Sequence, residues 1–382
     1  MRECNRLVET WMRGAGMNVS TDNAGNLRGL YPASKESAAR ILIGSHLDTV
    51  PNAGAYDGIL GVMLAIALVE QLAQQKLPFA IEVLAFSEEE GVRFSAPFIG
   101  SRALVGRLDS ELLARTDRDG ISVQQAITHY GLDPAKIPDA RITNDATCFL
   151  EFHIEQGPVL EHLQLPLGIV DAIAGQSRLE LFFRGAANHA GTTPMHLRRD
   201  ALAAAAEWAL VVEQVATATA GLVATVGLLE ATPGAVNVIA GECRATLDIR
   251  HASDAQRDTA LTHILAVAEK ICQRRNISLT TQTSLTQPAT PMDPFLIKQI
   301  EAAFNASGLT LHHMTSGAGH DAQILAEKIP AAMIFLRSPG GISHNPQESV
   351  LVEDVAKALE CGRHLLQQLA NSHAFLARTR RA

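Results

Sequence analysis

The sequence has few cysteines and no paired ones. Its five cysteines are odd in number, lie scattered along 382 residues and never form a Cys-x-x-Cys pair. This pattern indicates neither a disulfide framework nor a thiolate zinc site, and it fits a protein of a reducing compartment. The cysteines are Cys4, Cys148, Cys243, Cys272 and Cys361.

Long apolar runs and basic stripes are also missing. The longest apolar run, residues 59–69, is too short to cross a bilayer, and residues 1–14 contain no apolar signal core. The formal net charge is −8, only 4% of residues are aromatic, and no basic stripe is interleaved with aromatic residues. These absences argue against membrane and nucleic-acid partners. They predict a soluble, cytoplasmic protein.

What the sequence does contain is material for two domains. Alternating strand, loop and helix patterns over residues 1–174 and 290–382 predict one α/β domain. Residues 175–289 follow the order β-α-β-β-α-β, which is that of a ferredoxin-like unit, and predict an inserted α+β domain. With 47% hydrophobic residues, the chain can build a core in each domain.

Metal-ligand side chains accompany four predicted strands of the first domain. A lone histidine near a strand end is more often a hydrogen-bonded structural residue, but here the pattern recurs four times. Because an open α/β sheet places its sites beyond the carboxyl ends of its strands, we expect these side chains to meet in one crevice. They are His46 with Asp57, Glu89 with Glu90, His153, and His344.

This set of side chains predicts a two-metal hydrolase. Three imidazoles and two or three carboxylates exceed what one structural zinc uses. The mixed nitrogen and oxygen donors suit Zn²⁺, Mn²⁺ or Co²⁺ better than Mg²⁺ or Ca²⁺. Of Glu89 and Glu90, one is expected to bind metal while the other acts as general base on the attacking water, and spacing alone leaves open which does which.

The motifs themselves resemble those of a known family, the M20 metal-dependent amidohydrolases and peptidases. Within it the chain is most similar to the branch of allantoate amidohydrolase, N-carbamoyl-L-amino-acid hydrolase and β-ureidopropionase. The resemblance spans nearly the whole chain and is carried by GSHLDTVPNAGAYDG, FSEEEGVRF, EFHIEQGPVLE, NHAGTTPMHLRRDA, NVIAG with LDIRH, SGAGHDA and GISHNPQE. It implies a zinc-peptidase-like catalytic domain that has a mixed sheet with helices on both faces.

The resemblance also implies roles for the residues of the first domain. Asp57 would bridge two divalent metal ions per subunit, and Glu89 would be the general base. Asp48 would be the carboxylate that orients the imidazole of His46. His46 and His153 would bind one metal ion, and Glu90 and His344 the other.

For the inserted domain, the resemblance implies a lid that also forms a homodimer. His189 would reach the active site of a partner subunit and stabilise the oxyanion of the transition state. Asn237 and Arg250 would hold the substrate carboxylate, although for Arg250 an ion pair at the surface is the alternative. Gln156 and His320 would contact the substrate, with a packed structural histidine as the alternative for His320.

Within the family that the chain resembles, the HIEQG form around His153 is typical of the ureido-hydrolysing branch, so the resemblance favours ureido chemistry over peptide cleavage. The predicted reaction is hydrolysis of the terminal ureido group of a small carboxylate, with release of ammonia and carbon dioxide. Allantoate, from purine catabolism, is the first candidate substrate, and N-carbamoyl-L-amino acids are the second. An aminopeptidase or dipeptidase of the same fold is the alternative enzyme, and a catalytically silent metal-binding scaffold is the alternative of another class.

Overall fold

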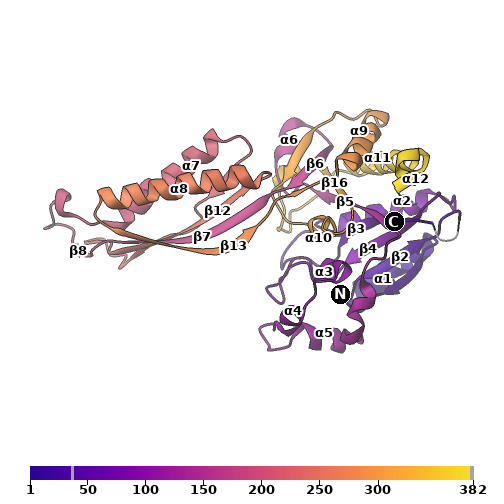
Figure 1. The fold of residues 1–382 in the computed structure, drawn as a ribbon, viewed down its shortest axis with the longest axis horizontal. Coiled ribbons are helices and arrows are strands. Elements are labelled where there is room, and N and C mark those ends of the chain that lie inside the picture. The colour runs from indigo at the N-terminus through magenta and orange to yellow at the C-terminus, as the bar shows by residue number, and fades with distance from the viewer. Residues whose placement is uncertain (36–37, 379–382) are drawn as a thin grey trace. The chain divides into compact units, whose positions relative to one another are not determined.

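The structure, a computed structural model, describes residues 1–35 and 38–378 of the chain (Figure 1). It divides into two compact units. Unit 1 comprises Met1–Asp171 and Met292–Ala382, and unit 2 comprises Ala172–Pro291. The boundaries expected from the sequence were 174/175 and 289/290.

A mixed nine-stranded sheet organises unit 1. Its order is β1-β2-β4-β3-β5-β16-β6-β14, with β15 paired to β6. The pairs β3/β4, β3/β5 and β5/β16 are parallel, whereas β1/β2, β2/β4 and β6/β16 are antiparallel. The strands are β1 Asn18–Thr21, β2 Leu27–Tyr31, β3 Arg40–His46, β4 Ala80–Phe86, β5 Ala146–Ile154, β6 Leu167–Ile173, β14 Thr290–Pro291, β15 His313–Ser316 and β16 Ala331–Leu336.

The central strands are almost entirely buried. Every residue of β4 and of β16 is buried. Parallel strands covered on both faces read as continuous apolar runs, which is why the sequence pattern identified them. The expectation of a mixed α/β sheet is therefore confirmed.

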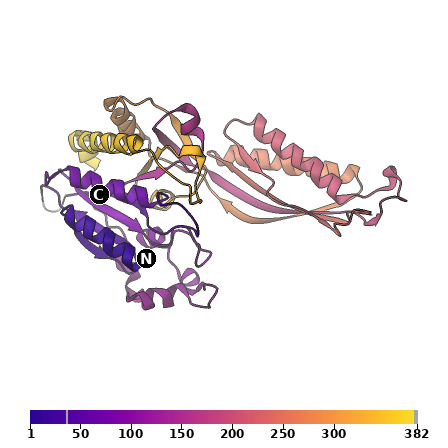
Figure 2. The same cartoon turned by 180° about the vertical axis from the view of Figure 1, so that it is seen from behind.

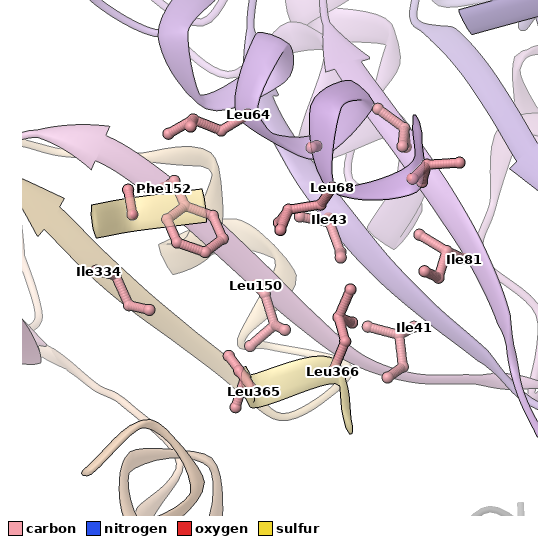
Figure 3. Packing of buried hydrophobic residues seen from close by; sticks show 14 of the residues in the cluster. Ile41, Ile43, Leu64, Leu68, Ile81, Leu150, Phe152, Ile334, Leu365 and Leu366 are labelled. Atoms are coloured by element: carbon pink, nitrogen blue, oxygen red, sulfur yellow. The ribbon is translucent and has the colours of Figure 1, made fainter. Parts of the chain in front are cut away.

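Helices cover both faces of this sheet. Leu64 and Leu68 of α2 and Leu365 of α11 pack on one face, against alternate residues of β3, β5 and β16 (Figure 3). Glu151 of β5 points to the opposite face, because neighbouring strand residues alternate, and there it accepts a hydrogen bond from the backbone of α10. The helices of unit 1 are α1 Arg2–Gly14, α2 Ile59–Gln71, α3 Ile99–Val105, α4 Ser110–Ala114, α5 Val123–Tyr130, α6 Val159–Leu163, α9 Pro294–Ala306, α10 Asp321–Leu325, α11 Val352–Asn371 and α12 His373–Arg378, with short 3₁₀ turns at Pro134–Ala140 and Pro339–Gly341.

Unit 2 is an antiparallel sheet with two long helices on one face (Figures 1 and 2). Inward residues of β7 and β12, such as Leu181 and Leu247, form a core with Trp208 of α7 and Ile264 of α8. The elements are β7 Gly175–Arg184, β8 Asn188–His189, a 3₁₀ turn Met195–Leu197, α7 Ala201–Ala218, β9 Val223–Thr225, β10 Leu229–Thr232, β11 Val238–Ile239, β12 Glu242–His251, α8 Asp254–Arg274 and β13 Ser278–Gln287.

One strand expected in unit 2 is divided in the structure. The sequence predicts a single strand over residues 223–229, whereas β9 and β10 are separate and pair with different parts of β12. Thr225 lies opposite Asp248 and Leu229 lies opposite Ala245, so the register slips by one residue between them. Gly227 lies in the interruption between β9 and β10. Because glycine has no side chain, the extra residue is accommodated most easily there.

Within the described residues, α7 is the one helix with the length and composition to cross a membrane. Glu207 and Glu213 interrupt the apolar sequence of α7, so the helix contains no long uninterrupted apolar run. One face of α7, which includes Ala204 and Trp208, packs in the core of unit 2. This is the arrangement of a core helix that covers a sheet.

Candidate metal centre

The topology of unit 1 brings four strand ends to one edge of the sheet. β3 ends at His46, and β5 carries His153 as its penultimate residue. β4 runs parallel to β3 and leads into the Glu89–Glu90 loop, while β16 runs parallel to β5 and leads towards His344. All four strands therefore point their carboxyl ends at the same crevice, as the sequence analysis expected.

Asp57 lies between two groups of possible metal ligands. Its Oδ1 is 3.2 Å from His153 Nε2 and 3.6 Å from His46 Nε2. Its Oδ2 is 3.0 Å from His344 Nε2, which in turn is 3.7 Å from Glu90 Oε1. Two sets of three donors result, His46–Asp57–His153 and Asp57–Glu90–His344, and each is compact enough to hold a metal ion.

Backbone carbonyls set the tautomers of two histidines. His46 Nδ1 is 2.8 Å from the carbonyl oxygen of Asp48, and His153 Nδ1 is 2.9 Å from that of Ile154. A carbonyl only accepts, so each Nδ1 carries the proton and each Nε2 presents a lone pair. The two Nε2 atoms are 3.4 Å apart and face the same carboxylate, which is an arrangement that suits two imidazole ligands of one cation.

The electrostatics of the cluster also fit a bound cation at this position. Burial alone would lower the pKa of His46, but the carboxylates of Glu89, Asp57 and Asp48 outweigh it and raise the pKa well above the ordinary value. Burial would raise the pKa of Asp57, yet its contacts with His153 and His46 hold that pKa far below the usual range. The carboxylates therefore favour a positive charge at the Nε2 atoms, carried either by protons or by a bound cation, and a negative charge on Asp57.

A glycine allows the close packing of Asp57 against His46. Gly58, which precedes α2, has φ +68°, and a Cβ atom there would lie 2.4 Å from the imidazole ring of His46. No side chain fits at that distance. The turn into α2 can therefore approach the ring only because residue 58 is glycine.

Asp48 contacts both His46 and the Glu89–Glu90 loop. Its carboxylate, expected to orient the imidazole of His46, has Oδ1 3.9 Å from Nδ1, and its backbone carbonyl is 2.8 Å from the same nitrogen. The carboxylate accepts hydrogen bonds from the backbone amides of Glu89 at 3.0 Å and Glu90 at 3.1 Å. These two amides are fixed donors that hold the carboxylate in its place beside the ring.

Glu89 and Glu90 lie next to different partners. Glu89 is buried, and its Oε2 is 3.8 Å from His46 Nε2. Burial raises the pKa of Glu89 well above its ordinary value; the charge of His46 opposes this, and Asp321, Glu90 and Asp48 reinforce it. Oε1 of Glu90 is buried without a hydrogen-bond partner on the side of His344. This orphan oxygen favours Glu90 as the ligand and Glu89 as the base.

Gln156 and His320 occupy different environments. The side-chain amide of Gln156 donates to Asp57 Oδ2 at 2.9 Å and approaches His344 Nε2 at 3.4 Å, so it lies at the edge of the cluster. His320 is buried, hydrogen-bonded to the Ser316 hydroxyl at 2.8 Å, and packed edge-on against the ring of His153. These contacts favour the alternative of a packed histidine at position 320.

Two of the three expected residues of unit 2 lie together, whereas Arg250 lies towards the other end of β12, opposite Gln176. His189 and Asn237 are exposed neighbours, because β8 pairs with β11 and the amide of Ala190 donates to the carbonyl of Asn237 at 2.9 Å. Arg250 forms two hydrogen bonds with Asp248, at 2.7 and 2.9 Å. The ion pair named as the alternative for Arg250 is therefore present.

Two buried carboxylates of the site had no assigned role in the sequence analysis. Glu151, two residues before His153, accepts hydrogen bonds from Ser45 at 2.8 Å and from the amide of Ala322 at 2.9 Å. Glu348 accepts from the backbone of the loop that carries Asp57. Both lie inside the quoted motifs EFHIEQG and GISHNPQE, so motif membership was the one signal that could have found them.

Comparisons with known proteins agree with this geometry. Residues 42–368 match the model of peptidase family M20/M25/M40. The chain is 42% identical over 373 residues to the N-carbamoyl-L-amino acid amidohydrolase of Geobacillus stearothermophilus, covering 97% of this chain and 91% of that protein. It is 37% identical over 391 residues to the allantoate deiminase of Arabidopsis thaliana, covering 92% of this chain and 74% of that protein.

Solved structures show the same fold. A hydantoinase/carbamoylase family amidase from Burkholderia ambifaria matches with a TM-score of 0.90 and 34% sequence identity, covering 96% of this chain and 89% of that chain. The family expected from the motifs is thereby confirmed. The chain belongs to the peptidase family M20/M25/M40 and is a hydrolase of carbon–nitrogen bonds.

Proposed function

We propose that this chain is a metal-dependent amidohydrolase that cleaves the ureido carbon–nitrogen bond of a small carboxylate. The observation that carries the proposal is the position of Asp57, with one oxygen facing His46 and His153 and the other facing His344. A single carboxylate between two ligand pairs is the arrangement that a two-metal hydrolase needs.

The donor set fits two divalent ions such as Zn²⁺, Mn²⁺ or Co²⁺. Imidazole and carboxylate donors suit these ions, and the lone pairs of His46 and His153 already converge. When bound, such a pair supplies Lewis acidity that activates water and polarises a carbonyl oxygen. His46 and His153 would hold one ion, Glu90 and His344 the other, and Asp57 both.

Glu89 would move the proton in this reaction. Burial raises its pKa above that of an ordinary glutamate, the direction that suits a group that takes a proton from water and passes it to the leaving nitrogen. Asp48 holds the backbone on which Glu89 sits. Gln156, at the edge of the cluster, would orient the ureido group through its amide.

Unit 2 would act as a lid and a dimerisation domain. His189 Nδ1 accepts a hydrogen bond from the amide of Gly191 at 3.0 Å, so the neutral ring carries its proton on Nε2. An exposed Nε2–H donor is what oxyanion stabilisation in a partner subunit's site requires. Exposed apolar side chains around it, Met195, Leu197 and Val236, support contact with a second copy.

Asn237 and Arg250 would recognise the substrate carboxylate. Asn237 lies beside His189, and the guanidinium of Arg250 has the planar shape that binds carboxylates. Because Arg250 is already paired with Asp248, the substrate would join or replace an existing ion pair. His320 would act on the substrate only through its packing against His153.

Allantoate is the first substrate we propose, within purine catabolism, and N-carbamoyl-L-amino acids are the second. The relatives named for these two activities support both. Either reaction consumes water and releases ammonia and carbon dioxide. The five free cysteines, four of them buried, support a reducing, cytoplasmic location.

The test is ammonia release by protein loaded with Mn²⁺ or Zn²⁺, with a chelated control. Allantoate, several N-carbamoyl-L-amino acids and simple dipeptides are compared. Chelator-sensitive release from allantoate supports the first substrate, and release only from N-carbamoyl-L-amino acids supports the second. Turnover of dipeptides alone overturns the ureido assignment, and silence of fully loaded protein on all three classes overturns the enzymatic proposal.

A further inference from the structure

Glu348 joins two loops from distant parts of the chain. It follows His344 in the segment between β16 and α11, and it is 5% exposed. Its Oε1 accepts hydrogen bonds from the backbone amides of Tyr56 at 2.9 Å and Asp57 at 3.1 Å. Its Oε2 accepts from the hydroxyl of Ser343 at 3.1 Å. One buried carboxylate is thus satisfied by three donors, two of them on the Asp57 loop and one beside His344.

The loop before Asp57 is shaped to fit this carboxylate. A Cβ atom at Gly54 would lie 2.3 Å from Cβ and 2.5 Å from Oε1 of Glu348. Only a residue without a side chain allows so close an approach. The backbone of Gly54 therefore packs directly against the carboxylate side chain of Glu348.

The two residues that Glu348 connects lie in loops, and their backbones are not fixed by a helix or a strand. Asp57 precedes α2 and lies outside any helix or strand, so its backbone position depends on the loop. The His344 side chain is 48% exposed, and its backbone has φ +54°, a conformation that side chains of non-glycine residues disfavour. The hydrogen bond from the neighbouring Ser343 to Glu348 ties this exposed segment to a buried carboxylate.

We propose that Glu348 is the positioning residue that holds Asp57 and His344 beside each other, so that both could bind the same metal ion. The proposal rests on the proposed two-metal function and adds a residue to it. Asp57 Oδ2 and His344 Nε2 are 3.0 Å apart, and Ser343 also lies 3.4 Å from the same Oδ2. Groups that orient metal ligands through hydrogen bonds commonly change metal affinity when they are removed.

A glutamine at position 348 is expected to work nearly as well as glutamate. Its carbonyl oxygen can accept from both backbone amides, as Oε1 does. Its NH₂ group can donate to Ser343, whose hydroxyl is then free to donate to Asp57. Alanine preserves none of these contacts and leaves two amides without their acceptor. If the hydrogen bonds of residue 348 position the ligands, glutamine should keep metal affinity and alanine should lose it. If the negative charge of Glu348 is what matters, both variants should lose affinity.

The experiment is a calorimetric titration of apo-protein with Zn²⁺ or Mn²⁺. We expect Glu348→Ala to weaken binding of at least one equivalent by about 10- to 100-fold and Glu348→Gln to stay close to the parent protein. Gly54→Ala should resemble Glu348→Ala, because it displaces the same carboxylate from the other side. If Glu348→Ala does not fold, Gly54→Ala still tests the inference. Co²⁺ absorption spectra of the loaded variants report the ligand geometry independently of activity.

Asp117→Ala is the matched control. Asp117 likewise accepts from two backbone amides of a loop, those of Asp119 and Ile121. We expect it to lower thermal stability without changing metal affinity. Parental affinity and an unchanged Co²⁺ spectrum in both Glu348→Ala and Gly54→Ala overturn the inference, as does equal weakening by Asp117→Ala. If the parent protein itself binds no metal, the proposed function fails first and takes the inference with it.

Discussion

Two adjacent glutamates in this protein are predicted to behave as different chemical groups. Glu89 is buried beside His46, whereas Glu90 faces His344 and Asp57. We expect Glu89→Gln to lower turnover by about 10²–10⁴-fold, the usual contribution of a general base, while metal affinity stays unchanged. Steady-state ammonia release and metal titration of the same preparation measure the two effects separately.

The control for this prediction is Glu90→Gln. Because Oε1 of Glu90 is the orphan oxygen on the side of His344, the amide should weaken metal binding, and excess metal should recover part of the activity. If instead Glu89→Gln loses metal and Glu90→Gln keeps it, the roles of the two residues are reversed.

The sequence could predict the metal-ligand candidates but not the residues that hold them. His46, His153 and His344 each accompany a recognisable strand, so their convergence follows from the topology of a parallel sheet. Glu348 binds backbone amides that lie close to the other end of the chain. Because nearly every residue has a backbone amide, no residue pattern in the sequence identifies these donors. For the same reason the sequence does not reveal that the carboxylate of Asp48 also accepts from the backbone amides of Glu89 and Glu90.

At the scale of elements, the start of α2 is where helix and metal centre meet. Gly58 has φ +68° and lies against the ring of His46. We expect Gly58→Ala to cost about 1–3 kcal/mol of unfolding free energy through backbone strain and to weaken metal binding by pushing the ring aside. Thermal unfolding of the apo-protein and metal titration measure the two consequences.

Gly120→Ala separates strain from collision. Gly120 also has a positive φ, +78°, but a Cβ atom there meets nothing within 4 Å. This variant should show a comparable loss of stability from the backbone alone and parental metal affinity. Equal metal affinity in Gly58→Ala and Gly120→Ala would show that the ring of His46 tolerates the added methyl group.

The elements that sequence predicted well are those whose pattern is set locally. α9 begins at Pro294 after an Asp293 cap, as the sequence indicated, and β4 and β16 are buried apolar runs. The short edge strands β1 and β15 were not expected. Most of their side chains are exposed, so they show no apolar alternation, and pairing with a neighbouring strand alone defines them.

At the scale of the whole molecule, the proposed chemistry is divided between two compact units. The ligand candidates and Glu89 belong to unit 1, whereas His189, Asn237 and Arg250 belong to unit 2. An exposed histidine that donates from Nε2 stabilises an oxyanion only if a substrate reaches it. In the proposed homodimer, His189 acts on a substrate bound in the site of the second copy. The exposed apolar side chains of Met195, Leu197 and Val236 would be buried where the two copies meet.

Subunit mixing tests this division directly. His189→Ala and Glu89→Gln should each be nearly inactive alone, because one lacks the oxyanion donor and the other the base. After joint refolding or co-expression, a mixed dimer contains one site with Glu89 from one copy and His189 from the other, so activity should return, as a symmetric exchange of residues between copies requires. Mixing His189→Ala with His189→Ala protein carrying a different tag is the control and should restore nothing. If the two variants stay inactive together while sedimentation confirms mixed dimers, His189 acts within its own subunit, and the proposed exchange between copies is wrong.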